Sequence, residues 1–195
     1  MPTFNKMALE REAHKYGFKR DTFEKVIRLK HILEFINNDD FLNKHLWLKG
    51  GTAINLTIFD LPRLSVDIDM DYNPNDTKAD MVLAREKITS ILRDYMESEG
   101  YLLSDESRFM HSLDGFHFQY VNAGGNRDII KVELNYSLRT HLFEAVEANV
   151  IPRIFEDSVT IKTIAPIEIF AAKANALLNR AAASVSLQVI CSASV

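Results

Sequence analysis

Hydrophobic positions recur with two different periods along this chain, and the two periods predict helices and strands in mixed order. Apolar residues spaced three or four apart indicate amphipathic helices, preceded by a more polar helical segment near the N-terminus. The predicted helices cover residues 6–16, 21–36, 53–59, 78–99 and 166–180. Alternation of apolar and polar residues indicates strands. The predicted strands cover residues 45–48, 65–72, 101–103, 115–122, 129–136 and 159–164.

Local signals mark several boundaries of these elements. Asp21 and Glu24 have the spacing of a capping box, and Gly100 is placed to end a helix. Pro166 can open the last helix, because a proline is tolerated at the first helical position. Two glycines in 123–126 predict a hairpin turn. The mixture of helices, strands and hairpins predicts an α/β or α+β fold with a mixed sheet flanked by helices.

Composition narrows the class of protein. The formal net charge is −4, with 23 basic and 27 acidic residues, so there is no global electrostatic attraction to nucleic acid or to an anionic membrane. Cys191 is the only cysteine, which excludes an internal disulfide. The N-terminus lacks the apolar core of a signal peptide, and no apolar run approaches the ~18 residues of a membrane span. A cytoplasmic protein is therefore expected.

The strand at 65–72 carries acidic residues on one face. Ser65, Asp67, Asp69 and Asp71 alternate with apolar residues, so the four polar side chains share a face. Like charges this close repel one another, and a divalent cation offsets that repulsion. Asp71, at the strand end, is expected to be the least involved. The alternative is a solvated edge strand with an acidic face.

Two further segments carry candidate chemistry. On the strand at 129–136, Lys131, Glu133 and Asn135 share a face, and Glu133 completes a carboxylate triad if this strand lies beside the aspartate strand. The alternative is an amphipathic strand whose polar side chains meet water. On the last helix, Lys173 has an alanine-rich surround and could contact a triphosphate; otherwise it extends along the helix surface to water.

Together these segments resemble one protein family. The order is Gly-Gly-Thr-Ala at 50–53, Arg-x-Ser-x-Asp-x-Asp at 63–69, Lys-x-Glu at 131–133, and Pro-x-Glu with a later lysine and Leu-Leu-x-Arg at 166–180. It is similar to the AbiEii/AbiGii toxins, which are nucleotidyltransferase-like proteins of type IV toxin–antitoxin systems. The resemblance implies a polymerase-β-like nucleotidyltransferase core. It also implies transfer of a nucleotide from a nucleoside triphosphate (NTP) to an acceptor hydroxyl, tRNA being one acceptor in the family.

The resemblance implies roles for individual residues. Asp67, Asp69 and Glu133 would hold Mg²⁺, with Glu133 helping to orient or deprotonate the acceptor hydroxyl. Lys173 would steady the triphosphate. The residues implied in binding the nucleotide phosphates are Gly50, Gly51, Thr52 and Ser65. Antitoxins of type IV systems generally act on the target, so a stable direct complex with the toxin is not expected.

The resemblance also predicts a domain organisation. A polar N-terminal helix occupies 1–20, a nucleotidyltransferase domain 21–180, and an atypical tail 181–195. The tail shows little helical periodicity, and the Arg-Asp pair and helical domain of the family are missing after Arg180. We therefore expect a truncated or divergent end, and the apolar residues of the tail favour a homodimer. Two other functions fit the same residues: a catalytically impaired nucleotide-binding or partner-binding remnant, and a nucleotidyltransferase acting on small molecules such as antibiotics.

Overall fold

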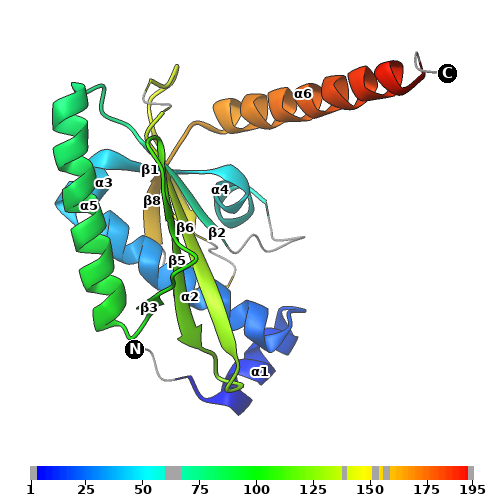
Figure 1. Ribbon diagram of the computed structural model, residues 1–195. Helices are drawn as coiled ribbons and strands as arrows, with labels where there is room; N and C mark the ends of the chain where they lie inside the picture. Colours follow the sequence, from blue (N-terminus) through cyan, green and yellow to red (C-terminus); the bar gives the residue numbers. More distant parts are fainter. Residues whose placement is uncertain (1–3, 60–66, 138–139, 151–153, 156–158, 193–195) are drawn as a thin grey trace.

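The fold is built on a mixed eight-stranded sheet in the order β3-β5-β6-β2-β1-β8-β7, with β4 pairing β5 as well (Figure 1). The computed structural model describes residues 4–59, 67–137, 140–150, 154–155 and 159–192, and only the backbone of 182–192. The strands are β1 (Leu46–Lys49), β2 (Asp67–Tyr72), β3 (Leu102–Leu103), β4 (Arg108–Phe109), β5 (Leu113–Val121), β6 (Arg127–Asn135), β7 (Val146–Val150) and β8 (Val159–Thr163). The predicted mixed sheet is confirmed.

Six helices accompany the sheet in the described part of the chain. They are α1 (Lys6–Lys15), α2 (Arg20–Asn38), α3 (Asp40–His45), α4 (Gly50–Thr57), α5 (Lys78–Ser98) and α6 (Pro166–Ser192). The expected turn residues hold: Gly100 follows α5 at a φ of 80°, and Gly125 turns the β5–β6 hairpin at 85°. No described helix is both long enough and apolar enough to cross a membrane.

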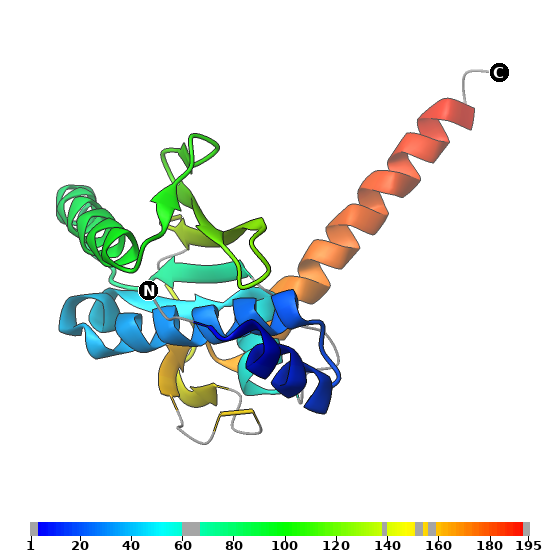
Figure 2. The same ribbon diagram turned by 90° about the horizontal axis from the view of Figure 1, so that it is seen from below.

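One face of the central strands is buried and the other is polar. Ile68 and Met70 of β2 and Val132 of β6 are almost fully buried, in one cluster with side chains of α2 and α5. Asp67, Asp69 and Asp71 of β2 and Glu133 of β6 lie on the opposite face, because neighbouring residues of a strand point to opposite sides. The helices α2 and α5 thus hold the sheet while leaving the polar face for chemistry. Both views show α6 projecting away from the rest of the protein (Figures 1 and 2).

Three expectations about the elements are wrong. The helix α2 begins at Arg20 without a side-chain cap, so Asp21 and Glu24 form no capping box. The short elements α3, β4 and β7 were not expected. The segment after Arg180 is helical, because α6 continues to Ser192 instead of ending near 180.

Glu24 has a structural role other than helix capping. Its side chain is fully buried and accepts hydrogen bonds from the Arg28 guanidinium, at 2.7 and 3.0 Å, and from the backbone N–H of Ala123, at 2.7 Å. Arg28 also donates to the Tyr101 hydroxyl at 3.1 Å. This buried pair therefore ties α2 to the β5–β6 hairpin and to the start of β3.

We expect Glu24→Ala to lower the free energy of unfolding by about 3–5 kcal/mol, because it leaves the Arg28 charge buried without its partner. Urea unfolding measures the change. The control is Glu97→Ala, which removes an exposed partner 3.8 Å from Arg93 and should cost less than about 1 kcal/mol. Equal effects of the two variants would contradict the role assigned to Glu24.

Candidate functional site

The polar face carries a row of residues that cross the sheet in register. Lys49 of β1 pairs with Asp69 of β2, and Asp69 pairs with Glu133 of β6. Directly paired residues of neighbouring strands point to the same face. The parallel pairing of β2 and β6 confirms the expectation that the two acidic strands are neighbours. Asp67 lies one step along the same face, paired with Lys131.

The electrostatics of Asp69 show how closely these charges interact. The pKa of its carboxyl is raised from 3.8 to about 6, first by burial and then by the negative charges of Glu133 and Asp67. The cations Lys49 and Lys173 act in the opposite direction. Asp69 is half-buried, whereas Asp67 and Glu133 are exposed. Asp69 thus lies between two other carboxylates, and their negative charges oppose its ionisation.

These carboxylates fit a divalent cation bound together with a nucleotide. Among the described residues, no three histidine, cysteine, aspartate or glutamate side chains converge closely enough to enclose a metal ion by themselves. Mg²⁺ does not need such a cage, since it usually takes one or two carboxylates and completes its shell with substrate phosphates and water. Asp67 and Asp69 supply hard oxygen donors, and a bound cation would relieve the repulsion that raises the pKa of Asp69.

Gly50 joins the row to a helix N-terminus. Its φ is +74°, a conformation that side chains rarely adopt. A Cβ at this position would overlap Oδ2 of Asp69 and lie 3.1 Å from the Cβ and Cγ of that residue. Both constraints require glycine. Because α4 begins here, its first backbone N–H groups, including that of Gly51, lack partners within the helix, and such groups can bind phosphate.

The Thr52 side chain contacts the protein backbone instead of facing the site as a phosphate ligand would. Its side chain is fully buried and its hydroxyl donates to the backbone carbonyl of Asp67. The side chain therefore fastens α4 to β2, and the phosphate contact expected of Thr52 stays a prediction.

Asp71 is not the surface residue that its place near the strand end suggested. It is only 1% exposed, and its Oδ1 accepts hydrogen bonds from Lys49 Nζ and from Asn135 Nδ2, the latter at 2.7 Å. Asp71 therefore holds the ammonium group of Lys49 in the row. Sequence reasoning missed Lys49 as a site residue; the signal was its place directly before the paired glycines.

Lys173 reaches the site from α6. Lys49, Gly50 and Lys173 line a pocket of about 410 Å³, together with the acids Asp71 and Glu168 and with apolar side chains that include Ile164 and Ala172. We call it the lysine pocket. Glu168, on the first turn of α6, accepts a hydrogen bond of 2.7 Å from the backbone N–H of Leu142 and so holds the start of the helix. Lys173 is exposed, and its charge acts on the Asp69 carboxyl, while its contact with a triphosphate stays a prediction.

The structure does not place the remaining predicted residues in this site. Arg63 and Ser65 lie outside the described residues, so the phosphate contact of Ser65 stays a prediction. Arg180 is not at a helix end, since α6 continues beyond it.

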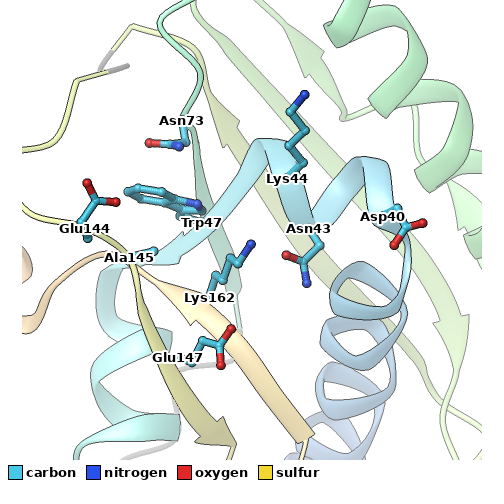
Figure 3. A pocket seen from close by; sticks show the side chains of 9 residues that line it. All are labelled: Asp40, Asn43, Lys44, Trp47, Asn73, Glu144, Ala145, Glu147 and Lys162. Carbon is cyan, nitrogen blue, oxygen red and sulfur yellow. The ribbon is translucent and has the colours of Figure 1, made fainter.

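A separate pocket of about 530 Å³ contains none of the three carboxylates of the row (Figure 3). Its lining comes from α3, β1, β7, β8 and the loops beside them. It mixes Lys44 and Lys162 with acidic side chains from Asp40, Glu144 and Glu147, and no residue of the row Lys49–Asp69–Glu133 lines it. The candidate site is therefore the row beside the lysine pocket.

Comparisons with known proteins give a family and similar folds. The family model described as nucleotidyl transferase AbiEii toxin, type IV toxin–antitoxin system, matches residues 31–185. MenT4, a nucleotidyltransferase toxin from Mycobacterium tuberculosis, is similar in fold, with a TM-score of 0.61 at 15% identity over 88% of this chain and 58% of that chain. JHP933 from Helicobacter pylori gives a TM-score of 0.49 at 18% identity over 77% of this chain and 53% of that one. This chain thus spans less than two thirds of either structure. No curated protein sequence matches it significantly.

We expect Gly50→Ala to lower the free energy of unfolding by about 1–3 kcal/mol, because alanine is strained at this φ. It should also weaken NTP binding in the presence of Mg²⁺, because the new methyl group displaces the Asp69 carboxylate. Urea unfolding and calorimetric titration measure the two effects. The control is Gly125→Ala, at a φ of 85° with no atom within 4 Å of the added Cβ. It should be strained similarly but bind NTP normally; equal loss of binding in both variants would contradict the Gly50–Asp69 contact.

The raised pKa of Asp69 predicts a pH-dependent stability. The folded protein holds this proton up to about pH 6, whereas the unfolded chain releases it near pH 3.8. The ionised group therefore destabilises the fold as the pH rises between these values. Asp69→Asn should raise the free energy of unfolding at pH 7, without divalent cations, by on the order of 1–3 kcal/mol. The gain should vanish below about pH 4.

Urea unfolding at several pH values tests this expectation. The control is Asp94→Asn on the exposed face of α5, which should show no such profile. A pH-independent effect of Asp69→Asn would exclude the repulsion as its cause.

Proposed function

The chain belongs to the AbiEii family of nucleotidyl transferase toxins of type IV toxin–antitoxin systems, and from this premise we propose that it transfers a nucleotide from an NTP to an acceptor hydroxyl with Mg²⁺. The acceptor we propose is the 3′ hydroxyl of an RNA, with tRNA as the first candidate. The observation that carries the proposal is the row Lys49–Asp69–Glu133, with Asp67 beside it and Lys173 on the adjoining pocket.

The acidic residues are assigned to the metal and to the acceptor. Asp67 and Asp69 would hold Mg²⁺, which when bound offsets the negative charge that develops on the transferred phosphate. Glu133 is paired with Asp69 yet exposed, so its carboxylate can meet an incoming hydroxyl and take its proton.

The basic residues and the helix N-terminus are assigned to the triphosphate. Lys49 and Lys173 face one pocket and both act on the Asp69 carboxyl, so a triphosphate in that pocket meets two cations. The backbone N–H groups of Gly50 and Gly51, at the start of α4, would bind phosphate oxygens, and Ser65 would contribute its hydroxyl. Apolar side chains of the same pocket would cover the nucleoside.

Purified protein should label total RNA when it is given a labelled NTP and Mg²⁺. The double variant Asp67→Ala with Asp69→Ala should reduce the labelling rate at least ~10²-fold, because it removes the metal ligands. Lys173→Ala should act in the same direction through loss of a cation. The control is Lys78→Ala, an exposed residue that begins α5 and should label at the normal rate.

Other outcomes of this experiment separate the alternatives. Labelling that survives in the double variant would contradict the assigned site. NTP binding without transfer to any acceptor would support a nucleotide-binding protein that lacks catalysis. Transfer to small hydroxyl compounds, with none to RNA, would support the small-molecule nucleotidyltransferase.

A further inference from the structure

A glycine lies next to Glu133 in the middle of a long strand, where glycine usually lowers stability. Gly115 of β5 pairs directly with Glu133 of β6. Its φ lies outside the positive range, and of the described atoms near it, an added Cβ would meet only the backbone oxygen of Arg108, at an ordinary 3.6 Å. Neither conformation nor crowding therefore requires glycine. A strand glycine without such a reason often marks a place where a ligand approaches closely.

The row of the candidate site continues past this glycine. Arg108 of β4 pairs with Gly115, so the row reads Lys49, Asp69, Glu133, Gly115 and Arg108 across five strands. Arg108 is exposed. Neighbouring strands lie about 4.8 Å apart, so Arg108 and Glu133 stand about 10 Å apart at the backbone with no side chain between them. The row thus has cations at both ends, carboxylates in the middle and an open step at Gly115.

A pocket of about 590 Å³ lies at this open step. Glu133, Gly115, Arg108 and His117 line it, and we call it the β4–β5 pocket. Its outer lining includes the acids Asp105 and Glu106, with Glu106 Oε2 3.7 Å from His117 Nδ1. Nδ1 is buried and makes no hydrogen bond with any described residue. Glu133 lines this pocket and its strand neighbour Asp69 adjoins the lysine pocket, so the carboxylates separate the two.

We infer that the β4–β5 pocket receives the acceptor, whose hydroxyl-bearing end passes over Gly115 to reach Glu133. The inference rests on the proposed function. In nucleotidyl transfer the acceptor oxygen and the leaving pyrophosphate stand on opposite sides of the reacting phosphorus. With the leaving group held in the lysine pocket, the acceptor enters from the other side of the carboxylates. An O–P bond forms to the acceptor, the P–O bond to pyrophosphate breaks, and the hydroxyl proton passes to Glu133.

Arg108 defines the chemical class of this acceptor. Its guanidinium, on the far side of the Gly115 gap, suits a phosphate group carried next to the attacking hydroxyl. The 3′-terminal nucleotide of a single-stranded RNA has that arrangement. The acids Asp105 and Glu106 direct the phosphate toward Arg108 and away from the rest of the pocket.

Two variants test the β4–β5 pocket without changing a residue of the lysine pocket. Gly115→Val narrows the open step; valine favours strands, and its Cβ would meet only the backbone oxygen of Arg108, at 3.6 Å. Arg108→Glu reverses the charge that meets the phosphate. The control for charge is Arg127→Glu, an exposed residue on the same strand as Glu133 but six positions away, roughly 20 Å at about 3.3 Å per residue.

The measurements are the affinity for a short fluorescent single-stranded RNA ending in a 3′ hydroxyl, the KM of transfer for that RNA, and calorimetric NTP affinity with Mg²⁺. We expect Gly115→Val and Arg108→Glu each to weaken RNA binding and raise its KM about tenfold, near the effect of losing one charged contact. NTP affinity should stay within about twofold in all variants, and Arg127→Glu should resemble the unaltered protein.

The outcomes separate this inference from the proposed function. If the RNA does not bind, or binds all variants equally, the inference is overturned. If it binds and the two variants weaken it but no nucleotide is transferred, the pocket stands and the proposed function fails. A cationic polyol that accepts the nucleotide, and does so better after Arg108→Glu, would overturn the assignment of a phosphate-bearing acceptor.

Discussion

The pairing of β2 with β6 is the constraint on which the candidate site depends. It sets Glu133 directly beside Asp69, although 64 positions separate them in the chain. The two carboxylates and Asp67 repel one another on the polar face, and the pKa of Asp69 rises to about 6 as a result of burial and then of this repulsion. The buried residues on the other face of the same strands hold the charges together, because a slip of one position would move apolar side chains into water.

A second constraint is the close approach of α4 to β2. Gly50 must lack a side chain, because Asp69 occupies the space that a Cβ would need, and Thr52 fixes the distance by its bond to the Asp67 carbonyl. The helix N-terminus, two lysines and the carboxylates are thereby brought to one place. The carboxylates attract a metal ion, and the lysines and the helix N-terminus attract a triphosphate. The site therefore suits a metal ion and a triphosphate bound together, and suits either of them alone poorly.

The site faces two pockets of different character. The lysine pocket is largely apolar with cations at its edge, whereas the β4–β5 pocket is polar and opens over a glycine. A reaction between two substrates needs a pocket for each substrate beside one reacting centre. The β4–β5 pocket depends on the register of β4, β5 and β6, which sets Arg108, Gly115 and Glu133 side by side.

The sequence by itself determined the long elements, the mixed fold class, the acidic face of β2 and the family, because periodicity and short motifs are local properties of the chain. It identified Asp67, Asp69, Glu133 and Lys173 as candidates. Only the tertiary structure decided that Asp71 is buried against Lys49, that Glu24 pairs with Arg28, and that Gly115 and Arg108 extend the row past Glu133. These facts depend on which strands and helices become neighbours, and contacts between distant segments leave no period in the sequence.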